Sequence, residues 1–436
     1  MESEIIWGLT AIVLIAIFLP YFFKFRRKQK EDILRRREAE QLGIGRPMAQ
    51  FPMIDASLCI GCGSCVEACP EGDVLGIVFG KAVVINGQRC VGHGYCEQVC
   101  PVSSLKVGLG DITTRPDIPI LDEHFQTTVP GLFVAGELGG ISLIRNAVTQ
   151  GRATVNRIAQ LKADTIAEAE YDVVIVGCGP AGMSAALTAI ENSLSYVVID
   201  QQGPGGTILQ YPRKKLVMTQ PVEIPLYGRL NKAEYTKEYL LEIWEDIAGK
   251  YQVKTHSGEK LEKVRKAGEK FEVTTSATSY TSHFVVLAMG RRGTPRKLDV
   301  PGEEQSKVMY QLVDAQSYNG RNLLVVGGGD SAVEAAIGLA RQDNNNVYIS
   351  YRKPKFFRIK KKNEDRITEL IDKRKITPLF NSEVMEIGAE SVKLKTDEGV
   401  VEIPNDYVFV FAGGIPPFDM LKEMGIAFGG EYRKIA

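Results

Sequence analysis

Two kinds of apolar run stand out along this chain. One is long and lies at the N-terminus, where Ile5–Phe23 (IIWGLTAIVLIAIFLPYFF) contains no charged residue. The others are short, and two of them, Val173–Val176 and Leu323–Val326, end directly at glycines. A long uncharged run predicts a membrane-spanning helix, whereas short apolar runs bounded by glycine predict buried strands of a parallel sheet. The pattern therefore predicts an α/β protein with one apolar N-terminal helix.

The residues that flank the N-terminal run favour one orientation in a membrane. Glu2 and Glu4 precede it, and Lys24–Lys30 and Arg35–Arg37 follow it. Because basic residues stay on the cytoplasmic side, we expect a single-pass anchor in the cell membrane, with the N-terminus outside and the body in the cytoplasm. A signal peptide would need a basic start and a small-residue cleavage site, and both are missing. A buried core helix is the other alternative, which the adjoining basic run disfavours. Glu31–Gly45 predicts a charged helical spacer.

The stretch Tyr171–Asp200 predicts a strand, a glycine-rich turn, a helix and a second strand. Its G-x-G-x-x-G motif, Gly177–Gly182, is called the first fingerprint below. The motif provides a tight turn, a backbone that can approach a pyrophosphate, and close packing of helix on strand. The acid that ends the second strand can accept a hydrogen bond from a ribose hydroxyl. A plain structural turn is the alternative, and the complete context disfavours it. The predicted contacts to a dinucleotide are Gly177, Gly179, Pro180, Ala181, Gly182 and Asp200.

A second glycine-rich turn, Gly327–Ala332, follows Leu323–Val326 and is called the second fingerprint below. The strand after it, Val347–Ser350, lacks a terminal acid to hold a free ribose 2′-hydroxyl and continues into cations. Cations at this place suit a 2′-phosphate, so NADPH is favoured over NADH. We interpret the nearby Lys360–Lys362 as a solvated basic face. The predicted contacts are Gly327, Gly328, Gly329, Asp330, Ser331, Ala332, Arg352, Lys353 and Arg358.

Charge and cysteine content add a second kind of chemistry. The chain has 436 residues with 53 basic and 53 acidic side chains, so nothing in its net charge indicates a nucleic-acid partner. Seven of its eight cysteines lie between Cys59 and Cys100, which favours metal–sulfur ligation in a reducing compartment over a disulfide framework. The eighth, Cys178, is expected to be a small filler in the first glycine-rich turn. The candidate metal ligands are Cys59, Cys62, Cys65, Cys69, Cys90, His93, Cys96 and Cys100.

The cysteines form two runs, and each run ends in Cys-Pro. The first has the spacing C-x2-C-x2-C-x3-C-P, in which three thiolates bind one cluster and the fourth reaches a second. Two interleaved runs of this kind disfavour zinc. Over about Phe51–Val107 the chain resembles the bacterial two-cluster ferredoxins. The resemblance implies one [4Fe-4S] cluster on Cys59, Cys62, Cys65 and Cys100, and a second cluster on Cys69, Cys90 and Cys96.

His93 stands where that family has a further cysteine of the second cluster. Two interpretations stay open. The second cluster is either a [3Fe-4S] cluster beside a surface histidine, or a [4Fe-4S] cluster with an imidazole corner. In the latter, the exchange of thiolate for imidazole removes a negative charge and raises the reduction potential.

The segment Asp111–Arg157 predicts a strand that ends at an acid and is followed by a helix. It resembles the final FAD-binding segment of low-molecular-weight thioredoxin reductases, in which the acid binds a ribityl or ribose hydroxyl. That family usually has Asp at the first acid and Gln in place of the helix asparagine. Here the segment precedes the first fingerprint, which predicts a circular permutation; a degenerate duplicate is the alternative. The implied flavin contacts are Gly136, Glu137, Asn146 and Ala147.

Two further stretches are expected at the flavin. One is a glycine-rich loop after Asp200, and the other is a strand end of small residues before Arg291. A helix is predicted over Asn231–Lys250. The expected contacts in the two stretches are Gly205, Gly206, Thr207, Ala288 and Gly290.

Thioredoxin reductases also carry Cys-x-x-Cys-Asp upstream of the second fingerprint. In this chain the matching acid is Asp314, and the cysteine positions hold Tyr310 and Val313. Without a dithiol, no hydride–thiol relay can use this site. The cysteine-free relatives include bacillithiol disulfide reductases and thioredoxin-reductase-type ferredoxin–NADP reductases.

Three functions follow from these features. The favoured one is an FAD-dependent NAD(P)H oxidoreductase that passes electrons from NADPH through FAD and the clusters to a quinone or a membrane or soluble electron-transfer protein. The reverse direction of electron flow is thermodynamically open. No side chain is assigned a catalytic role beyond positioning the cofactors. The second is an NADPH-dependent reductase of a low-molecular-weight disulfide with accessory clusters. The third is a non-catalytic assembly or redox-sensing protein, which two intact glycine motifs disfavour. The resemblance also implies a homodimer.

The predicted fold class is α/β, with two Rossmann-like three-layer nucleotide-binding domains for FAD and NADPH, a small α+β ferredoxin domain and one N-terminal transmembrane helix. The predicted divisions are 1–24 (anchor), 25–50 (charged linker), 51–108 (ferredoxin domain), 109–160 (permuted end of the FAD domain), 171–295 (FAD domain), 296–405 (NAD(P)H domain) and 406–436 (return to the FAD domain).

Overall fold

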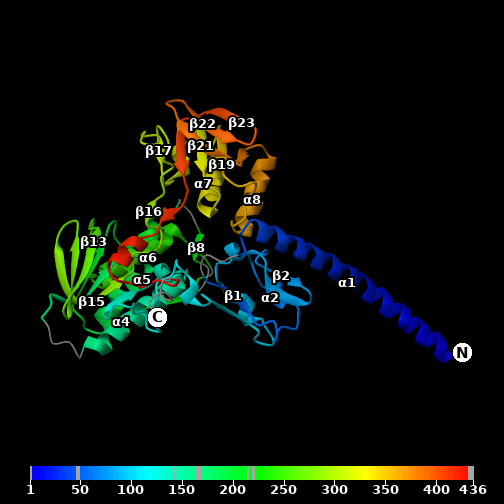
Figure 1. The fold of residues 1–436 in the computed structure, drawn as a ribbon, viewed down its shortest axis with the longest axis horizontal. Helices are drawn as coiled ribbons and strands as arrows, with labels where there is room; N and C mark the ends of the chain where they lie inside the picture. Colours follow the sequence, from blue (N-terminus) through cyan, green and yellow to red (C-terminus); the bar gives the residue numbers. More distant parts are fainter. Residues whose placement is uncertain are drawn as a thin grey trace. The chain divides into compact units, whose positions relative to one another are not determined.

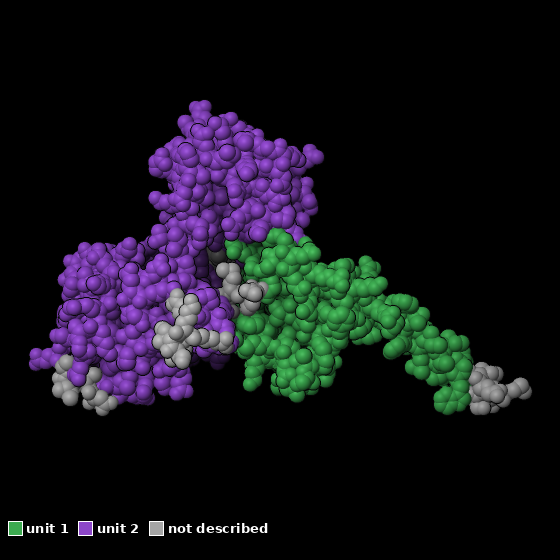
Figure 2. All heavy atoms as spheres, in the orientation of Figure 1, with its two compact units in different colours: residues 1–110, 357–362 green, residues 111–356, 363–436 purple. Residues whose placement is uncertain are grey.

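The computed structural model describes residues 2–45, 50–141, 143–162, 168–211, 213, 216–218, 221–232 and 234–430, without the side chains of residues 2–5, 216 and 218. The chain divides into two compact units (Figure 2). Unit 1 contains residues 1–110 and 357–362, and unit 2 contains residues 111–356 and 363–436. Each unit is described by itself.

Unit 1 begins with one unbroken helix, α1 (Glu2–Gln41), so the expected anchor and spacer are parts of the same element (Figure 1). The helix is long and apolar enough to cross a membrane, and none of its most apolar window is buried. Its C-terminal half packs on the small domain that follows. There the buried Asp32 accepts a hydrogen bond from Ile77 N at 2.8 Å and pairs with Arg35 at 2.8 Å.

The small domain of unit 1 consists of two antiparallel strand pairs and short helices. The strand β1 (Phe51–Ile54) pairs with β4 (Leu105–Gly108), and β2 (Leu75–Val78) pairs with β3 (Lys81–Val84). The helices α2 (Ser64–Glu67) and α3 (Tyr95–Gln98) each begin after a glycine with positive φ, which lets the chain turn sharply behind the preceding cysteines. The 3₁₀ helix η1 (Gly87–Arg89) precedes Cys90.

The first sheet of unit 2 is built from parallel strands with an antiparallel extension. Its strand order is β12-β7-β6-β15-β14-β13, and β5 also pairs with β15. The strands are β5 (Leu132–Val134), β6 (Tyr171–Val176), β7 (Tyr196–Asp200), β12 (Thr255–Ser257), β13 (Leu261–Ala267), β14 (Lys270–Thr275) and β15 (Ser279–Leu287). The strands β12, β7, β6, β15 and β5 run parallel, as a dinucleotide-binding sheet requires.

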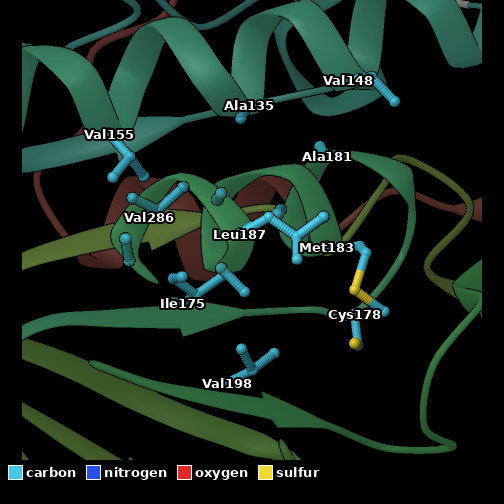
Figure 3. Close-up of a cluster of buried hydrophobic side chains, with 14 of the residues drawn as sticks. Ala135, Val148, Val155, Ile175, Cys178, Ala181, Met183, Leu187, Val198 and Val286 are labelled. Carbon is cyan, nitrogen blue, oxygen red and sulfur yellow. The ribbon is translucent and has the colours of Figure 1, made fainter. Parts of the chain in front are cut away.

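Two long helices cover one face of this sheet. They are α4 (Ile144–Leu161) and α5 (Pro180–Glu191). Figure 3 shows Val148 and Val155 of α4 facing α5, whose Leu187 lies over Ile175 of β6. A third helix, α6 (Lys237–Lys250), adds buried apolar residues such as Trp244 to the same core.

The second sheet of unit 2 is a five-stranded parallel sheet with the order β17-β24-β18-β19-β20. A separate antiparallel sheet has the order β21-β22-β23. The strands are β17 (Val308–Met309), β18 (Asn322–Val326), β19 (Asn346–Tyr351), β20 (Ile376–Phe380), β21 (Glu383–Ile387), β22 (Ser391–Thr396), β23 (Gly399–Pro404) and β24 (Tyr407–Val410). The helices with them are α7 (Asp330–Ala340) and α8 (Lys361–Asp372). The last helix, α9 (Phe418–Glu423), packs Leu421 into the core of the first sheet.

The expected division at residue 406 needs a correction. The strand β24 pairs with β17 and β18 and so belongs to the second sheet, and the chain leaves this sheet only after Val410. An apolar strand fits a buried position in either parallel sheet, which is why its sequence did not reveal its partner.

The last described residues lie against the start of the segment that was expected to be permuted. Ile120 N donates to Ala427 O at 2.9 Å, Gly429 N donates to Ile118 O at 3.1 Å, and Gly430 N donates to Thr113 O at 2.5 Å. From there the segment continues to β5, which lies beside β15 in register with Val285–Leu287. Residues 111–162 are therefore an integral part of the first sheet and its helix layer.

Shorter elements complete the structure. They are η2 (Ile112–Thr114), η3 (Glu137–Gly139), η5 (Gly206–Gln210), β8 (Leu216–Met218), β9 (Val222–Ile224), β10 (Gly228–Leu230), β11 (Tyr235–Thr236), β16 (Thr294–Pro295), η6 (Ala315–Ser317) and β25 (Gly414–Ile415).

Candidate functional site

The glycines of the first fingerprint meet three different surroundings. Gly177 has φ +103°, and a Cβ there would lie 2.5 Å from Ala288 O. A Cβ on Gly182 would lie 1.8 Å from Gly177 O, so only glycine lets α5 pack so closely on the turn. At Gly179 the nearest atom is Gly206 Cα, at 3.9 Å, which leaves the space in front of the helix N-terminus open. The three positions therefore suit a tight turn, a close helix and an approaching pyrophosphate.

The acid at the end of β7 shapes this turn. One Asp200 oxygen accepts from Cys178 N at 2.6 Å, and the other accepts from Gln202 N and Gly203 N at 2.7 and 2.8 Å. A carboxylate has about four acceptor positions, so capacity for a ribose hydroxyl remains. Cys178 itself is fully buried, and burial raises the pKa of its thiol to about 12.

The other predicted flavin loops lie against the same turn. Gly205 N donates to Cys178 O at 2.9 Å, and a Cβ on Gly206 would lie 2.8 Å from Gly179 Cα. Gly290 has φ +70°, and a Cβ there would lie 3.9 Å from the Thr207 hydroxyl. The structure thus brings together the fingerprint, the 205–207 loop and the end of β15.

The segment before the fingerprint contributes a further side to this site. A Cβ on Gly136 would lie 3.1 Å from Ala181 Cβ and 3.7 Å from Ala147 Cβ. Gly136 N donates to the buried Gln150 Oε1 at 2.7 Å. Our sequence analysis missed Gln150, because a single glutamine within a helix gives no signal of its loop partner. Asn146 is half-buried on the same helix.

Glu137 follows Gly136 directly and begins the 3₁₀ helix η3. Its side chain is exposed, yet surrounding protein atoms desolvate the carboxyl and raise its pKa, which the charge of Arg291 partly opposes. The residue is thus in contact with solvent while protein atoms surround part of its carboxyl group. That is the environment expected for a carboxyl that binds a cofactor hydroxyl.

The second fingerprint is also a tight turn before a helix. Gly327 has φ +140°, a Cβ there would lie 2.5 Å from Phe411 O, and Gly329 is the N-cap of α7. A Cβ on Gly328 would lie 2.3 Å from the ring of Tyr351, a contact that the sequence did not reveal. Asp330 Oδ1 accepts from Asn363 Nδ2 at 2.7 Å.

The other residues predicted to contact the nicotinamide nucleotide differ in their exposure and in the unit to which they belong. Ser331 is exposed and Ala332 is buried within the first turn of α7. Arg352 and Lys353 are exposed directly after β19, on the side where a nucleotide ribose would lie. Arg358 falls in residues 357–362 of unit 1, so the structure does not group it with them.

The candidate metal ligands of unit 1 line two cavities. Cys59, Cys62, Cys65 and Cys100 surround one, which has about 320 Å³ of empty space including its open mouth. Ala82 N donates to Cys59 Sγ at 3.4 Å, and Ser104 N donates to Cys100 Sγ at 3.3 Å. Hydrogen bonds from neighbouring serines lower the pKa values of the Cys62 and Cys100 thiols.

The second cavity, of about 340 Å³, is lined by Cys69, Cys90, Cys96 and His93. Burial raises the pKa of Cys96 to about 12, and the pKa values of Cys69 and Cys90 are raised for the same reason. Metal binding must therefore displace protons from these thiols. His93 Nε2 lies 3.3 Å from Glu71 Oε1, and His93 Nδ1 is buried without a hydrogen-bond partner.

These cavities fit iron–sulfur clusters better than single metal ions. Within the part of the chain that the structure describes, no three His, Cys, Asp or Glu side chains converge on one ion position. The ligands instead surround a space, as the corners of a cluster require. The four thiols of the first cavity and the three thiols of the second are those that the ferredoxin resemblance implies as two ligand sets, and His93 lines the second cavity beside them.

The two nucleotide-type turns and the cysteine-lined cavities define a class of protein, namely redox enzymes that use a dinucleotide and iron–sulfur clusters. The family model described as pyridine nucleotide-disulphide oxidoreductase matches residues 174–434, and the chain belongs to this family. The model of a 4Fe-4S dicluster domain matches residues 51–101. The resemblances to both families and the α/β fold class are thereby confirmed.

The relatives that match this chain include thioredoxin reductases and ferredoxin–NADP reductases. A thioredoxin reductase of Bacillus subtilis is 31% identical over 275 residues, which are 59% of this chain and 78% of that protein. A ferredoxin–NADP reductase of Ignicoccus hospitalis is 28% identical over 269 residues, or 60% of this chain and 83% of that protein. The solved bacillithiol disulfide reductase of Staphylococcus aureus has a TM-score of 0.53 and 26% identity, over 59% of this chain and 80% of its own. The chain is thus an FAD-dependent pyridine nucleotide oxidoreductase with a ferredoxin-like iron–sulfur domain.

Proposed function

We propose that this chain is a membrane-anchored oxidoreductase that passes electrons between NADPH, FAD, two iron–sulfur clusters and an acceptor at the membrane. When bound, the flavin converts two-electron hydride transfer into single-electron transfer, and the clusters carry single electrons. The observation that carries the proposal is the distribution of sulfur. Seven cysteines line the two cavities of unit 1, and the eighth, Cys178, is buried in the fingerprint turn, which leaves no dithiol for a disulfide relay.

The chain's own residues hold the cofactors in this proposal. The open face at Gly179 receives the FAD pyrophosphate, and Glu137 accepts from a flavin ribityl or ribose hydroxyl. The turn at Gly327 receives the nicotinamide nucleotide, and the exposed Arg352 and Lys353 pair with its 2′-phosphate, which favours NADPH over NADH.

The N-terminal helix gives the proposal its location. We assign α1 as a single-pass anchor with Lys24–Lys30 on the cytoplasmic side. Because the same helix continues into the ferredoxin-like domain, the clusters stay close to the bilayer, where a quinone or a membrane electron-transfer protein can accept electrons.

The test is electron paramagnetic resonance of the anaerobic, detergent-solubilised protein before and after NADPH, with NADH in a parallel sample. We expect NADPH to change the cluster signals within the turnover time. The variant with Arg352→Ala and Lys353→Ala should raise the KM for NADPH by about tenfold and leave the KM for NADH unchanged, while Lys360→Ala should change neither. If NADPH bleaches the flavin and the clusters never respond, the proposal fails.

The likeness to bacillithiol disulfide reductase favours one alternative, an NADPH-dependent reductase of a low-molecular-weight disulfide. Steady-state NADPH oxidation with a panel of low-molecular-weight disulfides distinguishes the two functions. Turnover with a disulfide and unresponsive clusters would establish the alternative.

A further inference from the structure

The second cavity of unit 1 has an unusual set of ligands. Three thiols, from Cys69, Cys90 and Cys96, line it together with the imidazole of His93. A four-iron cluster needs a ligand at each iron, and three thiolates leave one iron without a protein ligand. The position of the imidazole therefore decides which cluster the cavity holds.

The two ring nitrogens of His93 have opposite surroundings. Nε2 lies 3.3 Å from Oε1 of Glu71, whose residue is only 6% exposed. Nδ1 is buried and has no hydrogen-bond partner among the residues that the structure describes. A buried nitrogen without a partner is costly in a protein interior, unless a ligand satisfies it.

Two contacts fix the plane of the ring. Glu71 holds one edge through Nε2, and the ring of Tyr95 stacks on one face, with centroids 5.6 Å apart and an angle of 19° between the planes. Both Glu71 and Tyr95 also line the cavity. A histidine left at the surface beside a three-iron cluster would need neither a buried acid partner nor a stacked neighbour.

We propose that Nδ1 of His93 is the fourth protein ligand of the second cluster, which is therefore a four-iron cluster, and that Glu71 is a positioning residue. The Nδ1 lone pair binds iron, and the proton stays on Nε2, which donates to the Glu71 carboxylate. Such a hydrogen bond from the distal ring nitrogen to a carboxylate fixes the tautomer and orientation of a histidine ligand. The inference rests on the proposed function only in so far as unit 1 carries clusters.

The experiment uses the full chain in detergent, with its clusters reconstituted and then reduced chemically with dithionite. Labelling with ¹⁵N-histidine and pulsed electron paramagnetic resonance detects nitrogen bound to a reduced cluster. We expect a strong imidazole coupling in the wild type, which His93→Cys removes while the cluster remains four-iron. The matched control His124→Ala should keep the coupling unchanged.

Further variants separate ligation from general stability. His93→Ala should convert the second cluster to a three-iron cluster, visible in the oxidised protein. Glu71→Gln should keep the coupling, because its amide oxygen can still accept from Nε2, whereas Glu71→Ala should weaken the coupling and add a three-iron fraction. A three-iron signal in the wild type, or a four-iron cluster without nitrogen coupling, would overturn the proposal.

Dithionite makes this outcome independent of NADPH. Clusters that show the imidazole coupling with dithionite but never respond to NADPH would support the ligand and refute the proposed electron transfer. Clusters that respond to NADPH but lack the imidazole coupling would support the proposed electron transfer and refute His93 as a ligand.

Discussion

At the scale of single residues, the glycines of the first fingerprint make separable contributions. Gly182→Ala places a Cβ 1.8 Å from a backbone oxygen, so we expect a misfolded or strongly destabilised flavin domain. Gly179→Ala meets no protein atom closer than 3.9 Å, so the domain should fold, but the methyl group would project toward the pyrophosphate. We expect FAD binding to weaken by about tenfold, or roughly 1.4 kcal/mol. Thermal unfolding and flavin titration measure the two effects.

A Gly179→Ala protein that binds FAD as tightly as the wild type would show that the pyrophosphate does not approach this turn. The exposed Gly249 of α6, which lies in helical backbone and where a Cβ meets nothing within 4 Å, offers a Gly→Ala control for the loss of glycine flexibility in the unfolded chain.

Some of the residue contacts at this site could be predicted from the sequence, and others could not. The spacing of the glycines predicted their surroundings, because a turn between strand and helix has few solutions. The sequence did not predict that Gln150 and Tyr351 contact glycines. Each of these contacts depends on how one element packs on another, which no local pattern reveals. The same holds for Glu71, whose meaning depends on the fold around His93.

At the scale of elements, Asp172 joins the start of β6 to its neighbours. Burial works against its ionisation, but Lys162 Nζ at 2.8 Å and Ser195 N and Oγ at 2.7 and 2.8 Å outweigh this, and its pKa is lowered. A carboxyl with a lowered folded-state pKa stabilises the fold above its unfolded pKa of about 3.9, and this stability is lost as the pH falls.

We therefore expect Asp172→Asn to reduce the free energy of unfolding by about 1–3 kcal/mol at pH 7. The difference from wild type should shrink as the pH approaches about 4 and below. Thermal unfolding followed by flavin fluorescence measures it, with the exposed Glu245→Gln as control. A difference that stays constant over this pH range would exclude the ionised carboxylate as its source.

The N-terminal half of α1 is the proposed membrane anchor, and its C-terminal half packs on the small domain of unit 1. Two truncations can separate these roles. Removal of residues 1–24 should give a soluble protein that keeps its iron. Removal of residues 1–41 also deletes Asp32 and leaves the buried Ile77 N–H without its acceptor, at a cost of about 1–3 kcal/mol. Iron content and thermal unfolding measure the loss. Equal stability of the two truncated proteins would show that the helix does not support the domain.

One helix begins later than the sequence predicted, although a cap residue marks its start. The helix expected from Asn231 begins at Lys237, because Thr236 is its N-cap and accepts from Tyr239 N at 3.4 Å. The preceding residues form the short strands β10 and β11, whose pairing partners lie in the 216–224 stretch. Short strands carry too few residues for a period, so the sequence did not predict them.

At the scale of the whole molecule, the order of segments can be rearranged experimentally. Gly430, the last described residue, lies against Thr113, so a linker that follows it can connect to residue 111. We expect a variant with residues 168–436, a glycine–serine linker and residues 111–162 to fold and bind FAD, because β5, Gln150 and Glu137 regain their places. Residues 168–436 alone should bind FAD at least about tenfold more weakly.

Bound flavin per chain after gel filtration measures both proteins. If residues 168–436 bind FAD as well as the rearranged variant does, the 111–162 segment is a duplicate without a role at the flavin, and the permutation is wrong.

The place of β5 also sets the order in which the protein can assemble during synthesis. All eight candidate cluster ligands are made by Cys100, so the iron-binding module can form while most of the chain is still to be synthesised. β5 is made next, but its partner in β15 emerges only about 150 residues later. Until then β5 is an unpaired apolar strand tethered to a finished module. With this order of segments, we expect metal loading to be the early step of biogenesis and flavin loading the late one.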